Sequence, residues 1–132
     1  MTYLWIFLGG GVGSLLRFLT SEWTTRHWGS QFPWGTLAVN VTGCLMIGVL
    51  ARWLENPGQP DGTFPTRHLL IVGLCGGYTT FSAFSVQTLE LIRDHAFGKA
   101  IANVLLSVVC CLLSTSLGYW LASKNTSPLS LR

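Results

Sequence analysis

Hydroxyl and aromatic side chains gather in one stretch of an otherwise apolar segment, residues 73–85. The sequence there reads Gly-Leu-Cys-Gly-Gly-Tyr-Thr-Thr-Phe-Ser-Ala-Phe-Ser. In hydrocarbon an unpaired backbone N–H or C=O costs several kcal/mol, so irregular backbone at membrane depth persists only inside protein or beside water. A glycine- and hydroxyl-rich interruption of a spanning helix therefore indicates a candidate site for an ion or substrate.

Four residue types in this stretch bear on such a site. Glycines such as Gly76 permit left-handed or closely packed backbone, and hydroxyls such as those of Thr79 and Ser82 can pair freed backbone groups or face a permeant ion. Phe81 and Phe84 are three residues apart, so their rings share one face if this half is helical. The pattern predicts two aromatic rings beside a polar break.

Two further polar side chains fall inside other apolar segments. A charge near a helix centre costs at least about 2.5 to 3.5 kcal/mol, so Arg17 either extends to the interface or lines water. Asn40 follows Trp34 by six residues, which places it about 9 Å along a helix and inside the hydrocarbon. Its amide either bonds another helix or donates to a permeant anion. Both alternatives stay open for each residue.

The last apolar segment carries a polar stripe at helical spacing. Asn103, Ser107, Cys111 and Thr115 recur every four residues and so share one face. Such a stripe either mediates helix packing or forms a hydroxyl track beside an ion path. The residues alone leave both interpretations open.

The cysteines show no spacing typical of a metal or redox site. Cys44, Cys75, Cys110 and Cys111 all fall in apolar segments, without a C-x-x-C pair. Free cysteine commonly behaves as a small apolar residue. We therefore expect all four to be packing residues.

Composition indicates the class of protein that must position these groups. Of 132 residues, 49% are hydrophobic and only 10% charged, and the mean hydropathy is +0.47; soluble domains carry about 25% charged residues. We predict an all-α membrane protein with a single membrane domain, 1–132, and spans at about 3–23, 34–54, 67–94 and 100–122. The third predicted span, 67–94, is longer than the roughly 20 residues that a membrane-spanning helix needs. This length independently supports a break near Gly76–Thr79.

Charge excludes some functions and suggests an assembly. The net charge of +3 is dispersed, so nucleic acid is not an expected partner. A nucleophile beside a base, paired buried carboxylates and metal-ligand spacing are all missing from the sequence, so we do not expect an enzyme. Outside the first span, basic residues divide four against three between the two membrane sides, so insertion in both orientations is a hypothesis: Arg52, Arg67, Lys124 and Arg132 against Arg26, Arg93 and Lys99.

Three stretches together resemble one known family. They are Gly-Gly-Gly-Val-Gly-Ser-Leu-Leu-Arg at 9–17, Pro-Trp-Gly-Thr-Leu-Ala-Val-Asn-Val-Thr-Gly at 33–43, and residues 73–85. The chain is similar to the CrcB/Fluc fluoride channels. The resemblance implies a four-helix subunit in an antiparallel, dual-topology homodimer with two fluoride pores and a central structural sodium ion. It also implies passive export of cytoplasmic fluoride through a multi-pass protein of the bacterial inner (plasma) membrane.

The resemblance also implies roles for individual residues. Backbone carbonyls of Gly76 and Thr79 would hold sodium, and Arg17 would line an aqueous vestibule that attracts anions. Cys111 stands where a serine is expected, and a thiol is a weaker donor than a hydroxyl. The residues assigned to the fluoride pore are Asn40, Phe81, Ser82, Phe84, Ser107, Cys111 and Thr115.

Two other functions remain as alternatives. A small dual-topology, proton-coupled exporter needs a titratable carboxylate deep in a helix, whereas Glu22, Glu55, Glu90 and Asp94 lie near predicted span ends and Asp61 in a loop. A non-transporting membrane scaffold needs only close-packing surfaces such as the G-x-x-x-G face of residues 9–13. The scaffold leaves the broken third helix without an explanation.

Overall fold

The computed structural model describes residues 1–55 and 64–124, so Asp61 and Arg132 lie outside the described residues. Within these two ranges the chain forms helices and no strands. Four of its segments are long and apolar enough to cross a membrane, which confirms the four-span prediction: Thr2–Trp28, Trp34–Leu54, His68–Arg93 and Phe97–Lys124. A single domain over 1–132 stays a prediction.

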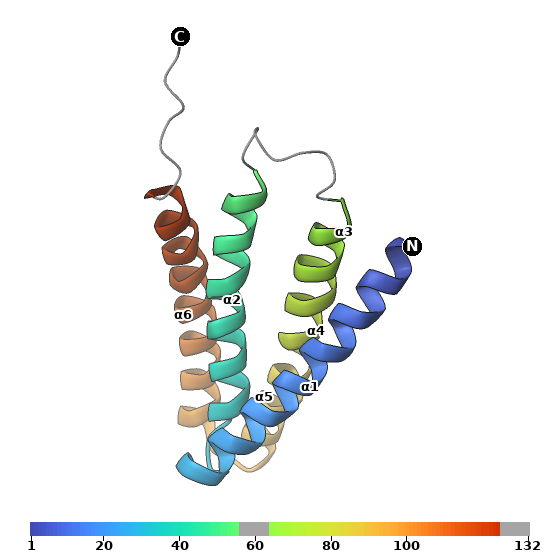
Figure 1. The fold of residues 1–132 in the computed structure, drawn as a ribbon. Helices are drawn as coiled ribbons and strands as arrows, with labels where there is room; N and C mark the ends of the chain where they lie inside the picture. Colours follow the sequence, from blue (N-terminus) through green and yellow to red (C-terminus); the bar gives the residue numbers. More distant parts are fainter. Residues whose placement is uncertain (56–63, 125–132) are drawn as a thin grey trace.

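The third span is built from several short pieces, whereas the other three are continuous helices (Figure 1). The continuous helices are α1 (Thr2–Trp28), α2 (Trp34–Leu54) and α6 (Phe97–Lys124). The third span comprises the π-helix η2 (His68–Cys75), α4 (Gly76–Tyr78) and α5 (Phe81–Arg93), and the short helix α3 (Phe64–Arg67) leads into it.

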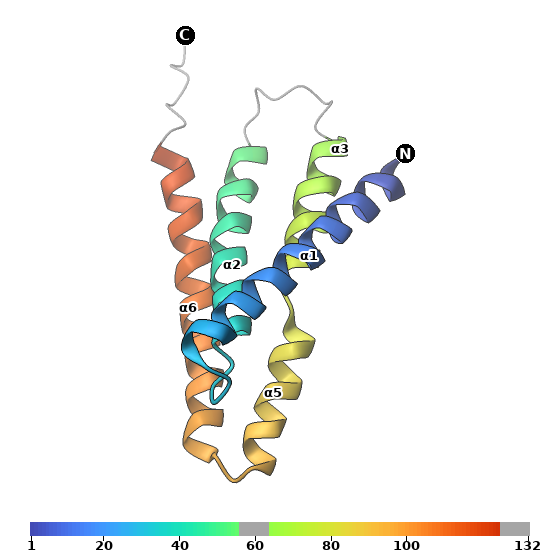
Figure 2. The ribbon, with the colours of Figure 1, turned by 60° about the horizontal axis from the view of Figure 1, so that its bottom comes forward.

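The predicted break is confirmed and lies at two threonines. Thr79 (φ −78°, ψ 155°) and Thr80 (φ −150°, ψ 114°) are extended, and Figure 2 shows the resulting link into α5. Gly76 is still helical (φ −63°, ψ −38°). The break is therefore made by extended β-region backbone, which any residue can adopt, and left-handed glycine is not required.

Glycines instead allow α1 to cross the third span with its backbone in contact. A Cβ on Gly9 would meet the Leu69 carbonyl oxygen and the Cα of Gly73. A Cβ on Gly77 would lie 2.5 Å from the Gly10 carbonyl oxygen. The first helix thus uses the small-residue packing face that the sequence predicts.

A second close contact joins α2 to α6, which run side by side in the same direction (Figure 1). Gly48 lies against the Thr115 carbonyl, and Gly118 lies against the backbone of α2. Asn103 and Ser107 are buried, with 1% and 8% of their surface exposed. Much of the polar stripe therefore serves helix packing.

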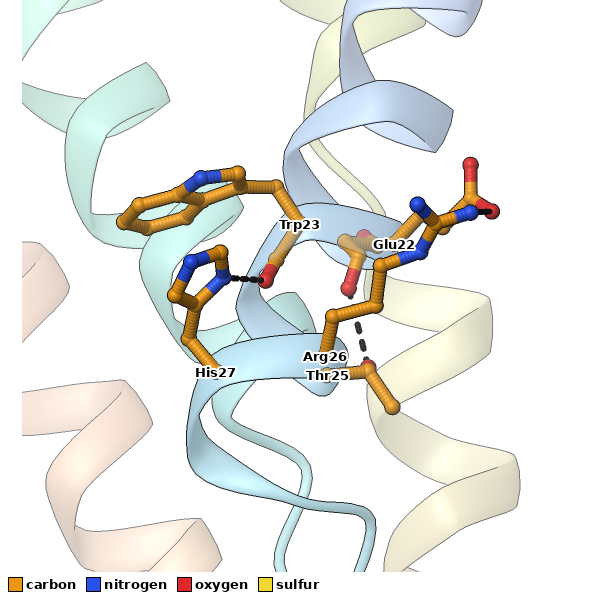
Figure 3. A network of polar contacts seen from close by, with 6 residues as sticks. Glu22, Trp23, Thr25, Arg26 and His27 are labelled. Atoms are coloured by element: carbon orange, nitrogen blue, oxygen red, sulfur yellow. Dashed lines mark hydrogen bonds and ion pairs between the residues drawn. The ribbon is translucent and has the colours of Figure 1, made fainter.

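The first helix continues beyond the predicted end at residue 23 and reaches Trp28. Its last turns are polar and bonded within the helix (Figure 3). Arg26 forms an ion pair with Glu22 (2.5 Å), and His27 Nδ1 donates to the Trp23 carbonyl (2.8 Å). These residues form a polar helix end with an exposed tryptophan, as is typical of a membrane–water interface.

The glycine contact on α1 yields a stability prediction. We expect Gly9→Ala to destabilise the fold by about 1 to 3 kcal/mol, because the new methyl meets backbone that cannot move independently. Thermal unfolding of purified protein in detergent measures the effect. Gly11→Ala is the matched control, since a Cβ there meets no atom within 4 Å. Equal melting temperatures for the two variants would contradict the packing argument.

Candidate ion site at the helix break

One side-chain amide pairs both backbone groups of a residue in the break. Asn40 Nδ2 donates to the Thr80 carbonyl (3.0 Å), and the Thr80 N–H donates to Asn40 Oδ1 (2.8 Å). Asn40 therefore meets the requirement that backbone freed from a helix be paired within protein. Because an amide carries two N–H donors, its second N–H is not needed for this pairing.

The same threonine starts the following helix. The Thr80 hydroxyl accepts from the Ala83 N–H (3.1 Å), and Ser82 Oγ lies 3.1 Å from it. This is an N-cap, which satisfies one of the donors at the start of α5. Thr80 is one of the hydroxyl residues of the stretch 73–85 that we expect to pair freed backbone groups, and a threonine directly before a helical segment is a recognised start signal.

A groove opens beside the break, and five predicted pore residues meet there. Its volume is about 390 Å³. The rings of Phe81 and Phe84 lie 5.2 Å apart at 44°, and Phe81 is 78% exposed. We call this space the aromatic groove. Its lining residues are Asn40, Gly43, Cys44, Ile47, Thr79, Thr80, Phe81, Phe84, Ser107, Val108, Cys111 and Leu112.

Two residues assigned to the pore do not line this groove. Thr115 lies one turn beyond Cys111, where its carbonyl packs against Gly48. Ser82 is exposed, and its hydroxyl approaches that of Thr80. The structure therefore brings together the central part of the predicted polar track and leaves its last member, Thr115, at the backbone contact between α2 and α6.

Arg17 lines a second space, which we call the polar cavity. Its volume is about 710 Å³, and Arg17 is half-buried beside it. Arg17 therefore lies beside a cavity of the fold, and its role in an aqueous vestibule stays a prediction. The lining residues are Ser14, Arg17, Phe18, Ser21, Thr25, Ser30, Gln31, Phe32, Pro33, Gly35, Thr36, Thr80, Ala83, Gln87, Glu90, Leu91, Asp94, Ala96 and Lys99.

Thr80, at the break, lines both the polar cavity and the aromatic groove. Charged residues of either sign line the cavity, including Arg17, Lys99 and Asp94. None of the described residues that line the groove has a charged side chain. An ion moving from one to the other would pass from charged to neutral surroundings at the Asn40–Thr80 pair.

The break also releases a backbone carbonyl. In an unbroken helix the Thr80 N–H would donate to the Gly76 carbonyl one turn earlier, but it donates to Asn40 instead. The last regular bond before the break runs from the Thr79 N–H to the Cys75 carbonyl (2.9 Å). The Gly76 and Thr79 carbonyl groups therefore sit at the end of the helix, where oxygen ligands for a hard cation can arise.

A hydrogen-bond chain that the sequence did not predict ties α5 to α6. Asn103 Nδ2 donates to the Thr88 hydroxyl (2.9 Å), which donates to the Phe84 carbonyl (2.7 Å). Asn103 is 1% exposed, so this amide is well shielded from competition by water or lipid. These two hydrogen bonds hold the turn of α5 that carries Phe84, one of the two aromatic residues of the groove.

Comparison with known proteins finds related sequences that match along most of the chain. Residues 4–119 match the family model described as "CrcB-like protein, Camphor Resistance (CrcB)". A relative from Opitutus terrae named "Fluoride-specific ion channel FluC" is 46% identical over 117 residues, 89% of each chain. Relatives of the same name from Rhodospirillum rubrum and Methylocella silvestris are 44% and 41% identical, covering 90% and 92% of this chain and 92% and 93% of theirs.

The amide pairing predicts a local effect at the break. We expect Asn40→Ala to accelerate hydrogen exchange at the Thr80 amide and to destabilise the protein by about 1 to 3 kcal/mol, because buried backbone groups lose their partner. Residue-resolved exchange and thermal unfolding measure the two effects. Ser116→Ala is the control, since its exposed hydroxyl bonds only back to Leu112 in its own helix. Unchanged exchange at Thr80 in folded Asn40→Ala protein would refute the pairing.

Proposed function

Since this chain belongs to the CrcB-like protein family, we propose that it is a fluoride-selective channel through which cytoplasmic fluoride leaves the cell passively. It is a multi-pass protein of a bacterial membrane. The observation that carries the proposal is the neutral aromatic groove beside a broken spanning helix, in a chain similar along about nine-tenths of its length to relatives named fluoride-specific channels.

The groove lining suits a small, strongly hydrated anion. A pore must replace lost water contacts without binding the ion so tightly that it cannot leave. Asn40 and Ser107 supply neutral donors, and the edges of the Phe81 and Phe84 rings carry partial positive charge. The N-terminus of α5 adds the positive end of its dipole at the same place. Weak, repeated contacts of this kind favour passage over capture.

The polar cavity serves as the approach to the groove. Arg17 and Lys99 would attract anions to the part of the cavity that they line, although the cavity also carries the carboxylates of Glu90 and Asp94. Both cations stay in the wide cavity and out of the groove, where a fixed positive charge would retain fluoride. Attraction and conduction are thereby assigned to different residues.

An antiparallel homodimer with two pores is part of this proposal. The groove of one chain is open beside Phe81, so a second copy would complete its wall. The near-equal division of basic residues between the two sides supports insertion in both orientations. Each copy would then contribute one groove, which accounts for two pores.

A structural sodium ion between the two copies also belongs to the proposal. Sodium prefers oxygen ligands, and the carbonyls of Gly76 and Thr79 lie at the helix end where regular bonding stops. When bound, the cation would supply positive charge that holds carbonyl groups of two chains together. Gly76 has no side chain, and the Thr79 hydroxyl already donates to the Cys75 carbonyl, so we assign sodium binding to the two backbone carbonyls.

The proton-coupled exporter finds no support in the groove. Such a carrier needs a carboxylate along its transport path, and none of the described groove residues is acidic. Glu22 pairs with Arg26 at the end of α1, and Glu55 accepts from Tyr119 (2.8 Å) at the end of α2. Those two carboxylates are held at helix ends.

The decisive experiment is anion efflux from liposomes that contain the purified protein. Fluoride and chloride are compared under matched gradients, with an ionophore that dissipates the membrane potential. We expect rapid loss of fluoride and negligible loss of chloride, because the neutral donors and ring edges of the groove can replace the water contacts that fluoride loses. Absence of fluoride loss from protein shown to be dimeric would overturn the channel and favour the membrane scaffold.

The ring edges predict a separable effect on flux. We expect Phe84→Ile to lower fluoride efflux much more than it lowers the yield of folded dimer, because isoleucine keeps apolar bulk but lacks an electropositive edge. The control is Phe7→Ile on α1, whose ring is 75% exposed and lies away from the groove lining. Wild-type efflux by Phe84→Ile protein would count against the role of the rings.

A further inference from the structure

Two cysteines that are 67 positions apart in the chain line the aromatic groove from neighbouring helices. Cys44 on α2 and Cys111 on α6 both line it. Gly48 and Thr115 lie one turn further along the same two helices and are in backbone contact. Because α2 and α6 run in the same direction, that contact sets the register that also pairs the cysteines (Figure 1).

Cys44 and Cys111 each precede the Gly48–Thr115 contact by four residues, so the two side chains lie one helical turn from that contact on neighbouring helices. Both cysteines are free and only partly buried, so the space of the groove gives access to their sulfur atoms. The other two cysteines differ in place. Cys75 is buried, and neither Cys75 nor Cys110 is among the groove-lining residues.

We propose that Cys44 and Cys111 form a two-thiolate binding site for a soft metal ion of the Cu(I), Ag(I) and Hg(II) class. Thiolate is the preferred ligand of soft ions, and these ions accept two ligands in a near-linear arrangement. Each thiol loses one proton to water and forms one sulfur–metal bond, so the sulfur oxidation state does not change. With Hg(II) the product is neutral, which suits a site at membrane depth.

The donor set disfavours the commoner metals. Zinc sites in proteins use three or four ligands from cysteine, histidine and carboxylate. In residues 1–55 and 64–124, no group of three such side chains could hold a metal ion. A pair of thiols with no third protein ligand therefore favours metal ions that form stable complexes with two ligands.

An occupied site would obstruct the groove, and this consequence rests on the proposed function. Cys44 is one turn from Asn40 on α2, and Cys111 is one turn from Ser107 on α6. A metal bridge between the two sulfur atoms would lie in the space lined by these donors and by Phe84. We infer that soft metal ions inhibit conduction by this chain.

Metal retention tests the site without reference to transport. Full-length protein in detergent is loaded with Hg(II), washed with a monothiol that removes singly bound metal, and analysed by mass spectrometry for mercury. We expect a single Hg(II) per chain to remain, with its sulfur–mercury absorbance in the ultraviolet. Cys44→Ser and Cys111→Ser should each lose it, whereas Cys75→Ser and Cys110→Ser should keep it. Retention by either of the first two, or loss from the Cys110→Ser control, would overturn the assignment.

Fluoride efflux from liposomes, measured before and after Hg(II), tests the consequence. Each variant is normalised to its own untreated rate. We expect Hg(II) to remove most efflux from wild type and from Cys110→Ser, and little from Cys44→Ser or Cys111→Ser. Retained metal with undiminished wild-type efflux would refute inhibition. Absence of efflux before treatment would refute the proposed function and leave the metal assignment to the retention assay.

Discussion

The structure depends on one constraint, which is that backbone groups at membrane depth must be paired within protein. A helix satisfies this requirement automatically, but the third span is broken at Thr79 and Thr80. The amide of Asn40 pairs both backbone groups of Thr80, and the Thr80 hydroxyl caps the helix that follows. With these bonds in place the chain can interrupt a spanning helix, aim the start of α5 at the groove and set two aromatic rings beside it.

Helix contacts made through glycine determine what faces the break. Gly9 and Gly77 let α1 and the third span touch backbone to backbone, and Gly48 does the same for α2 against α6. Close approach at these points fixes the register of neighbouring helices, since each tolerates no Cβ. The register then brings Asn40 and Ser107 to one groove. Packing residues with no chemistry of their own thus decide which chemical groups meet.

The separation of charged residues from the aromatic groove gives the site its character. Arg17 and Lys99 line the wide polar cavity, whereas the described lining of the groove is neutral. In a poorly solvated space an unpaired charge interacts far more strongly than in water, so a fixed cation there would hold an anion in place. In the proposed channel, neutral donors and ring edges would attract an anion less strongly and allow it to move on.

The sequence by itself determined four apolar spans, a break in the third and the aromatic pair, because segment length and three-residue spacing are local properties. It also indicated small-residue packing at Gly9. Only the tertiary structure decided the partner of Asn40, the cavity that Arg17 lines, and the loss of Thr115 from the groove. The sequence predicted packing roles for the cysteines, and only the structure placed Cys44 of α2 and Cys111 of α6 in the same groove. These outcomes depend on the register between helices that are distant in the chain, and that register arises from backbone contact in three dimensions.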